Sequence, residues 1–364
     1  MAKKVFIFIF AAFGAIAILN SCNSDDSDPN GKNPDPDDSE LPTPEPENPE
    51  PPKEGTFNYK TFHKVHTAFG DGLSQNVEDS FDFPTDIEKV KSIKMYVQFD
   101  CPCNIWDVFA NIQAKDKISG EWYEIGRYIT PYGKDSSPLE RGLEFDVTDF
   151  KSILTGTTEL KAYTEVWGAD GWLISVDFDF IYGESDYKYS SVIPILQYNA
   201  NSIDGEPYGE PHNFVMNKMI NLPENSEAAH LRTIISGWGH ATPNDPGGRG
   251  CAEWCFRTHH ILINNVSSFN HYLGSIGCAD NPIIDQRGNW KPDRAGWCPG
   301  MAVPTRIDKL DKNLLGKQFK FEYQFQEWEN NMEYPGDNPH AYYALSTFVI
   351  VKSNTPIEKP TVVN

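Results

Sequence analysis

The sequence predicts an all-β protein, because three segments alternate apolar and polar side chains with the period of a half-buried strand. Clusters of Gly, Pro, Asn and Asp separate such segments, and these residues favour turns. Many strands joined by loops of mixed length are typical of β-sandwiches and jelly rolls, not of a sheet with crossover helices. The three clearest segments are residues 93–99, 174–182 and 319–325.

Turn residues at 182–186 follow a long predicted strand, and we place a domain boundary there. Two β domains of similar length result, over residues 57–184 and 185–364. The clearest helical signal is short. Thr148 or Asp149 is expected to cap one or two turns that continue to Leu154.

The composition excludes one class of partner. The chain has 364 residues and a formal charge of −21, so a phosphate backbone would be repelled and we expect no nucleic acid partner. Aromatic residues make up 13% of the chain, and rings of this kind are what the apolar faces of sugars pack against.

The first residues have the features of an export signal. Lys3 and Lys4 precede an apolar run at 5–19 that is too short for a comfortable membrane span. Cys22 follows a small residue, as in a bacterial lipoprotein, so we expect residues 1–21 to be removed and Cys22 to carry lipid. The predicted location is the outer membrane of a Gram-negative bacterium, at the cell surface or facing the periplasm. Plain secretion with Cys22 unmodified is the alternative.

Residues 22–56 are rich in Pro and in acidic side chains and cannot bury apolar area. They predict a disordered, self-repelling tether that holds the body away from a membrane surface. A disordered tail without a spacing role is the alternative. The signal contributes +2 and the tether −9, which leaves a formal charge of −14 on the body.

Six cysteines remain once Cys22 is set aside, and an even number in an exported chain indicates disulfides. Counting alone allows many pairings. A zinc site built from the last four is an alternative, although the usual Cys-x-x-Cys spacing is absent. The shortest loops pair Cys101 with Cys103, Cys251 with Cys255 and Cys278 with Cys298.

Three carboxylates stand beside aromatic residues, and this is the main chemical signal in the chain. Sugar C–H faces lie on rings, while a carboxylate accepts hydroxyl hydrogen bonds or moves a proton. Each acid taken singly is more often a solvated surface charge. Together, in an aromatic-rich exported chain, they favour a carbohydrate site. The three are Asp107 after Trp106, Glu165 between Tyr163 and Trp167, and Glu253 before Trp254.

Local patterns give each acid a setting. A strand over residues 106–114 turns Asp107 away from the apolar face, and alternation places Glu165 on one face with Tyr163 and Trp167. The third acid sits inside the Cys-Ala-Glu-Trp-Cys run, so a disulfide would fix its backbone.

Two basic residues, Arg249 and Arg257, flank Glu253 in sequence. An apolar wall raises the pKa of such an acid and cations lower it. The bland alternative is a disulfide corner with an ordinary surface Glu.

Several familiar catalytic patterns are absent from the sequence. There is no His-Glu-x-x-His, no Gly-x-Ser-x-Gly and no phosphate-binding loop. Apart from the cysteines, no group of residues in the sequence looks like a metal cluster, and we expect no cofactor.

Five segments are distinctive at the level of whole motifs, among them Cys-Ala-Glu-Trp-Cys and Pro-Asp-Arg-Ala-Gly-Trp-Cys. They make the chain from about residue 60 to residue 364 closely similar to the peptide:N-glycosidase F family, bacterial amidases that remove N-linked glycans. The similarity does not cover the signal or the tether. The segments are residues 67–75, 120–132, 236–241, 249–258 and 292–308.

This resemblance implies two eight-stranded antiparallel jelly rolls side by side, with the active site in the cleft between them. It implies hydrolysis of the β-aspartylglucosamine amide, which frees the glycan and converts Asn to Asp without a metal. The implied substrates are N-glycosylated proteins or peptides, and we expect a monomer.

The resemblance also implies roles for single residues. The principal catalytic acid lies in the family's Trp-Asp pair and corresponds to Asp107, which we assign to the scissile amide and its water. Glu253 would hold that water from the other domain, while Glu165 and Arg294 orient the first sugar. The family's three disulfides match the shortest-loop pairing. Substrate-binding residues are expected to be Trp106, Trp167, Arg294, Trp254 and His240.

Two other functions stay open. A glycosidase that uses Glu253 and Asp107 would cut between the two core sugars and leave one sugar on Asn. A noncatalytic glycan-binding lipoprotein would bind glycans without forming a product. Fold alone does not separate these functions, because β-sandwiches host many of them.

Overall fold

The computed structural model describes residues 54–198, 206–207, 216–241, 250–326 and 342–363. The predicted signal, the tether with Cys22, and Arg249 lie outside these residues. Every strand pairing between the described strands is antiparallel. No helix in this part of the chain is long and apolar enough to cross a membrane.

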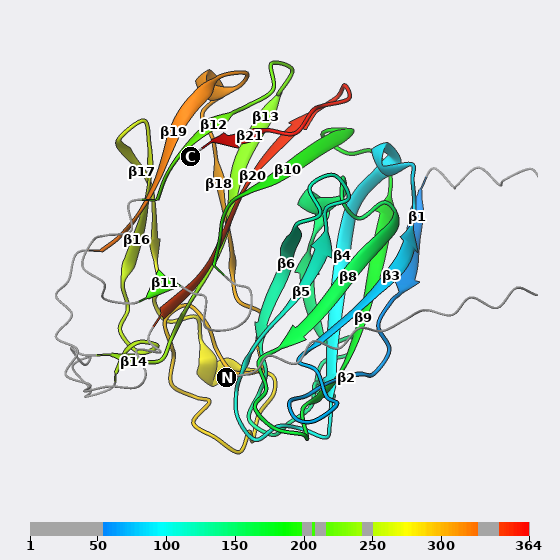
Figure 1. The fold of residues 1–364 in the computed structure, drawn as a ribbon, viewed down its shortest axis with the longest axis vertical. Helices are drawn as coiled ribbons and strands as arrows, with labels where there is room; N and C mark the ends of the chain where they lie inside the picture. The colour runs from blue at the N-terminus through cyan, green and yellow to red at the C-terminus, as the bar shows by residue number, and fades with distance from the viewer. Residues whose placement is uncertain (1–53, 199–205, 208–215, 242–249, 327–341, 364) are drawn as a thin grey trace, which may run out of the picture. The chain divides into compact units, whose positions relative to one another are not determined.

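The N-terminal half, residues 55–182, consists of two sheets with a shared apolar core (Figure 1). One sheet has the order β1-β9-β4-β7, with β2 also paired to β9, and the other has the order β3-β8-β5-β6. The strands are β1 Gly55–Lys60, β2 Val65–Thr67, β3 Asn76–Phe83, β4 Val90–Asp100, β5 Phe109–Lys115, β6 Trp122–Ile129, β7 Leu143–Asp146, β8 Gly156–Thr164 and β9 Trp172–Tyr182.

The C-terminal half, residues 189–363, repeats this plan with its own core. One sheet has the order β10-β20-β13-β18, with β11 also paired to β20, and the other has the order β17-β16-β19-β12-β21. The short strands β14 and β15 form a separate ribbon. The strands are β10 Tyr189–Tyr198, β11 Glu206–Pro207, β12 Met216–Asn221, β13 Ala228–Trp238, β14 His240–Ala241, β15 Cys251–Ala252, β16 Thr258–Ile263, β17 Val266–Tyr272, β18 Thr305–Lys309, β19 Gln318–Phe325, β20 Tyr342–Ser353 and β21 Thr361–Val363.

The all-β prediction is confirmed, and the three alternating segments lie in β4, β9 and β19. Their apolar positions are buried as the period requires: Ile93 and Val97 of β4 have no exposed surface. Within the described residues the helices are short 3₁₀ turns: η1 Ile87–Lys89, η2 Thr148–Phe150, η3 Cys278–Asp280 and η4 Lys312–Leu314.

Two local expectations were wrong. Neither Thr148 nor Asp149 caps η2, whose N-cap is Val147. Asp149 is buried instead, because its carboxylate forms ion pairs with the C-terminal half. The predicted strand over residues 106–114 starts only at Phe109, where the hydrogen-bond ladder to β6 and β8 begins.

The two halves form one compact unit over residues 51–364. Described strands of residues 55–182 pair only among themselves, apart from an isolated bridge between Tyr128 and Ala302. The proposed boundary near residue 184 falls between the two sets of strands, and whether each half is an independent domain stays a prediction.

Two buried charge clusters join the halves. Arg127 of β6 donates to Ser236 Oγ at 3.0 Å and to the Ala344 carbonyl at 2.7 Å, both in the C-terminal half. Asp149 accepts from His230 Nε2 at 2.9 Å, and its other oxygen pairs with Lys352 Nζ at 3.1 Å. Burial raises the pKa of Asp149, but the hydrogen bond from His230 and the nearby cations together outweigh burial and hold the pKa well below its usual range.

Candidate active site

One end of the β3-β8-β5-β6 sheet gathers three functional candidates from distant parts of the sequence. Asp107 precedes β5, Tyr132 follows β6, and Glu165 follows β8. The register pairs Phe109 with Ile129 and Ala110 with Thr164, so the start of β5 and the ends of β6 and β8 meet. The same end of this sheet therefore carries all three residues.

The loop that carries Asp107 is held by specific hydrogen bonds. The Trp106 amide donates to Asn104 Oδ1 at 2.9 Å, and the Val108 amide donates to Thr130 Oγ1 at 3.0 Å. A disulfide between Cys101 and Cys103 lies just before it. These bonds fix the backbone on both sides of Asp107, although it lies outside the strand.

Glu253 enters from the C-terminal half and is equally well fixed. A disulfide between Cys251 and Cys255 brackets it. Its amide donates to the Gly239 carbonyl at 3.1 Å, and its carbonyl accepts from the Ala295 amide at 2.7 Å. The backbone is thus tied to the end of β13 and to the segment that carries Arg294.

Arg294 brings the two acids together. Its Nε lies 3.1 Å from Glu253 Oε1, and its Nη2 lies 3.6 Å from Asp107 Oδ2. The same Nη2 donates to the Tyr132 hydroxyl at 3.0 Å. One cation from the C-terminal half therefore contacts two groups of the N-terminal half and one acid of its own.

The guanidinium of Arg294 is fully buried, and two backbone carbonyls also accept from it. Nη1 donates to the Pro292 carbonyl at 3.0 Å and Nη2 to the Asn289 carbonyl at 2.7 Å. The ring centroids of Trp254 and Trp297 lie 4.5 Å and 4.9 Å from its Cζ. This aromatic, carbonyl-lined setting holds the charge in place and away from water.

The electrostatics of Asp107 set it apart. Burial is the main cause that raises its pKa, to about 6, and the charge of Glu253 raises it further. The charge of Arg294 and a hydrogen bond from Tyr132 lower it, but by less. Its Oδ2 is buried without a hydrogen-bond partner. A carboxylate with a pKa close to neutral and a free lone pair is suited to accept and return a proton.

His240 lies on the exposed side of Glu253, with Nε2 3.3 Å from Glu253 Oε2. The hydrogen bond to Glu253 raises the pKa of the imidazole, while burial opposes the rise. The indole Nε1 of Trp254 donates to the same Nε2 at 3.1 Å. Protonation of His240 would exchange the Trp254 contact for a donation to Glu253.

The predicted aromatic residues divide into two groups. Trp106 and Trp167 are exposed over 63% and 61% of their surface, and Phe69 packs edge-on against Trp167 at 5.0 Å. Trp254 is buried and serves as a wall for Arg294. Exposed rings are available to a substrate, whereas the buried indole acts through the cation.

Glu165 does not lie on a strand face, because β8 ends at Thr164. Its amide donates to the Phe109 carbonyl at 2.9 Å, so its backbone continues the sheet edge beside the Asp107 loop. Its side chain is half-buried. Burial, followed by the charge of Glu165, raises the pKa of Tyr342. Glu165 therefore lies at the same end of the sheet, beside a residue of β20.

Tyr132 was missed as a site residue, because its sequence context indicates only a turn. Burial, and then the charge of Asp107, raise the pKa of its hydroxyl, so the hydroxyl keeps its proton and remains a donor. The position of Tyr132 follows only from the pairing of β5 with β6, which brings the residues after β6 to the same end of the sheet as the loop before β5.

The cysteines pair as the shortest loops suggest, including Cys278 with Cys298. Among the described residues, the group with metal-ligand spacing is this last pair with Asp293. A disulfide sulfur is not a thiolate ligand, and Asp293 Oδ1 already accepts from the amides of Ile276, Gly277 and Cys278. The zinc alternative therefore fails for these cysteines.

Comparison with known proteins agrees with this geometry. The chain is 60% identical over 317 residues to peptide-N(4)-(N-acetyl-β-D-glucosaminyl)asparagine amidase F of Elizabethkingia miricola, which covers 86% of this chain and 88% of the relative. The chain belongs to the peptide-N-glycosidase F family. A family model described as peptide-N-glycosidase F, C terminal, matches residues 210–350.

Solved structures of the family superpose closely. A crystal structure of peptide-N(4)-(N-acetyl-β-D-glucosaminyl)asparagine amidase matches with a TM-score of 0.82 at 60% identity, over 85% of this chain and 100% of that chain. PNGase F, a glycosylasparaginase from Flavobacterium meningosepticum, matches equally well. PNGF-II, at 12% identity and a TM-score of 0.65 over 83% of this chain and 66% of its own, shares the fold alone.

Proposed function

We propose that the protein is a peptide-N-glycosidase, an amidase that hydrolyses the bond between N-acetylglucosamine and asparagine in N-glycosylated proteins or peptides. The observation that carries this proposal is the meeting of Asp107 and Glu253 at one buried arginine. The relatives named for this activity, at 60% identity over most of the chain, support it.

Amide hydrolysis needs a base for water, donors for the developing oxyanion and a proton for the leaving nitrogen. Asp107 supplies the base, because a pKa of about 6 leaves it mostly ionised at neutral pH and still able to take a proton. Tyr132, whose hydroxyl stays protonated, donates toward that carboxylate.

Glu253 and Arg294 complete the site from the C-terminal half. Glu253 orients water, since Arg294 and His240 each hold one of its oxygens. Arg294 offsets the charge of two acids that would otherwise repel each other. Glu165, at the same sheet end, orients the first sugar, and the exposed rings of Trp106 and Trp167 carry sugar or peptide.

Product analysis separates the proposal from its rivals. The purified body is incubated with a denatured N-glycoprotein, and the former glycosylation site is sequenced by mass spectrometry. An amidase leaves Asp and no sugar on the peptide, whereas a glycosidase leaves one N-acetylglucosamine on Asn. Glycan binding without any product would favour a noncatalytic lectin.

We further propose that the chain is exported, cut before Cys22 and anchored by lipid in an outer membrane, with a monomeric body of two domains, 57–184 and 185–364. The sequence around Cys22 supports the anchor. Metabolic labelling with an alkyne fatty acid tests it: the wild type takes up label and Cys22→Ser does not. Equal labelling of both would refute the anchor.

A further inference from the structure

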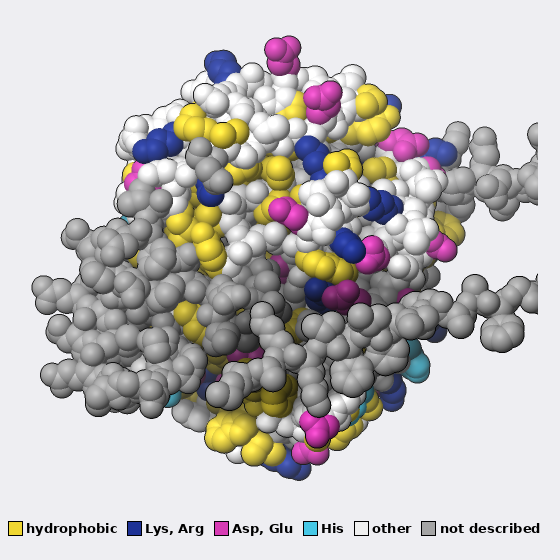
Figure 2. All heavy atoms as spheres, in the orientation of Figure 1, with side chains coloured by type: hydrophobic (Ala, Val, Ile, Leu, Met, Phe, Trp, Pro, Cys, Tyr) yellow, Lys and Arg dark blue, Asp and Glu magenta, His cyan; other side chains and the backbone are white. Residues whose placement is uncertain are grey.

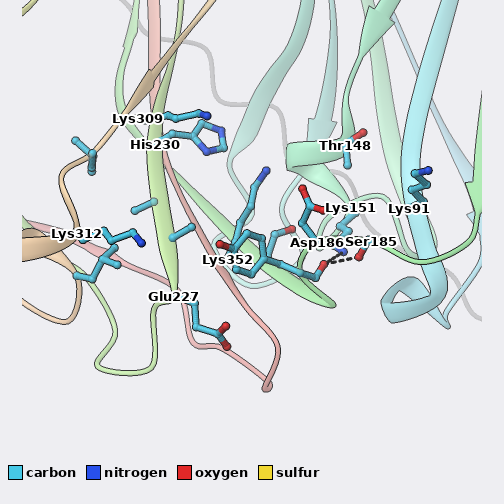
Figure 3. A pocket seen from close by; sticks show the side chains of 16 residues that line it. Lys91, Thr148, Lys151, Ser185, Asp186, Glu227, His230, Lys309, Lys312 and Lys352 are labelled. Atoms are coloured by element: carbon cyan, nitrogen blue, oxygen red, sulfur yellow. Dashed lines mark hydrogen bonds between the residues drawn. The ribbon is translucent and has the colours of Figure 1, made fainter.

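A cavity away from the Asp107 site lies between the two halves. It has a volume of about 490 Å³ and is lined by the region around η2, the segment that connects the halves, and strands β13, β18 and β20. Figure 3 shows Lys309 and Lys312 on one side of it, Lys91 on the other, and Lys352 and Lys151 between them. None of these residues belongs to the Asp107 site.

The lining is strongly basic in a strongly acidic protein. Five lysines line the cavity against two acids, Asp186 and Glu227, in a body whose formal charge is −14. Glu227 is occupied, since it accepts from the Asn354 amide and side chain. Figure 2 shows both acidic and basic side chains on one face of the protein.

Three of the lysines have no neutralising partner. Lys91, Lys309 and Lys312 form no ion pair or side-chain hydrogen bond with any residue that the structure describes. Lys352 pairs with Asp149 at 3.1 Å. Lys151 donates to two backbone carbonyls, which carry no charge. Water hydrates the three exposed lysines, and with no carboxylate on them they are free to contact an anion.

A hydroxyl in the lining adds a hydrogen-bond donor. Thr148 Oγ1 accepts from the Ile93 amide and so has its own proton to give. Ser190 also lines the cavity, but its Oγ has no accessible surface and does not face the ligand space.

We propose that this cavity binds a small oxyanion, a phosphate or sulfate group, either free or as the ester of a sugar. Lysine ammonium groups supply the charge and the hydroxyl of Thr148 supplies a hydrogen bond, and an oxyanion accepts both kinds of donor. A volume of about 490 Å³ lies in the range of pockets that hold small molecules, so it accommodates a monosaccharide ester. Because both halves contribute lysines, the ligand bridges them.

A pH dependence follows from Lys151. Burial, and then the charge of Lys352, lower the pKa of Lys151 to about 8, while Glu88 opposes this. Lys91 and Asp186 are the other charged groups of the N-terminal half and the connecting segment that line the cavity. A bound dianion favours the charged ammonium, so binding takes up protons near pH 8 and weakens as the pH rises above it.

Calorimetric titration of the full body with inorganic phosphate, sulfate and glucose 6-phosphate, at constant ionic strength, tests the site. We expect saturable binding that weakens by about tenfold or more in Lys309→Ala/Lys312→Ala. Both lysines are exposed, so the fold should survive, and deglycosylation measured in parallel should be unchanged. Lys60→Ala, which removes an exposed lysine of β1, should bind as the wild type does.

The ligands decide between the two sources of the oxyanion. Tighter binding of glucose 6-phosphate than of phosphate makes a sugar ester the occupant, and equal binding makes it the free ion. Absence of saturable binding, equal affinity for neutral glucose, or the same loss in Lys60→Ala and the double variant would each overturn the proposal. Amidase activity is independent of all these outcomes.

Discussion

Two arginines are buried without exposed surface where the halves meet, and they are held in opposite ways. Arg127 forms a closed pair with Glu124: Nε and Nη2 donate to Oε1 and Oε2 at 2.8 Å and 2.7 Å, and the Ser346 hydroxyl adds a bond to Oε2 at 2.5 Å. The contact of Arg294 with Asp107 is looser. Nη2 lies 3.6 Å from Asp107 Oδ2, and this oxygen accepts no hydrogen bond.

The difference separates a structural contact from a reactive one. Burying a charge is tolerable when every lone pair is satisfied, which is the case for the pair that Arg127 and Glu124 form. Asp107 is buried without a full set of hydrogen bonds, and its pKa is raised for this reason. The side chain as a whole keeps 11% of its surface exposed, and there a substrate amide or water can contact the carboxylate.

The sharpest test of this comparison is Asp107→Asn. Removing the base should lower kcat by about 10² to 10⁴-fold, the usual contribution of a positioned acid or base. Turnover of a fluorescent N-glycopeptide measures it. Asp79→Asn, at an exposed acid of β3, is the matched control and should keep wild-type turnover. A variant at Asp107 with near-normal turnover would remove the residue from the mechanism.

Breaking the ion pair between Arg127 and Glu124 should destabilise the protein. Arg127→Met leaves Glu124 buried and unpaired, which should cost about 3–5 kcal/mol in the free energy of unfolding. Urea denaturation followed by fluorescence measures the loss, and Glu124→Leu combined with Arg127→Met should restore part of it because no charge is left alone. If the single variant unfolds at the wild-type urea concentration, the contact does not hold the halves together.

Local patterns in the sequence predict the strands but not the contacts between distant residues. The strands at 93–99 and 319–325 follow from period two, because alternation is a local property. The strand start at Phe109 does not, because Trp106 and Val108 fit the apolar pattern while Asn104 and Thr130 hold them in a loop. The resemblance named Asp107 and Arg294, but their distance depends on how two halves pack, which no local pattern encodes.

The roles of Tyr132 and of the basic cavity could not be predicted either, because both depend on contacts between distant segments. Tyr132 becomes a partner of Asp107 only because β6 lies beside β5. The lysines of the cavity come from four separate parts of the chain, around residues 91, 151, 309–312 and 352. Contacts that span such distances follow from topology.

Asp107→Asn should also stabilise the protein, in contrast to Arg127→Met. The folded-state pKa of about 6 exceeds the unfolded value, so the folded state holds this proton more tightly and loses stability as the pH rises toward 6. At about 1.36 kcal/mol per pH unit, the gain for the Asn variant is at most about 3 kcal/mol above pH 6. It should vanish below about pH 3, where the carboxyl is protonated in both states. Urea titrations at several pH values measure this, and a variant less stable than the wild type at pH 8 would contradict it.

The smallest effect should come from the rim of the site. Trp167 is exposed over 61% of its surface and touches no charged group of the Arg294 cluster, so its ring contributes binding that is the same before and during reaction. Trp167→Ala should therefore raise KM for a glycopeptide by about tenfold, an apolar contact of 1–2 kcal/mol, and leave kcat unchanged. Tyr272→Ala removes an equally exposed ring on β17 and should alter neither constant. A fall in kcat comparable to that of Asp107→Asn would mean that this ring belongs with the incompletely bonded acid and not with the surface around it.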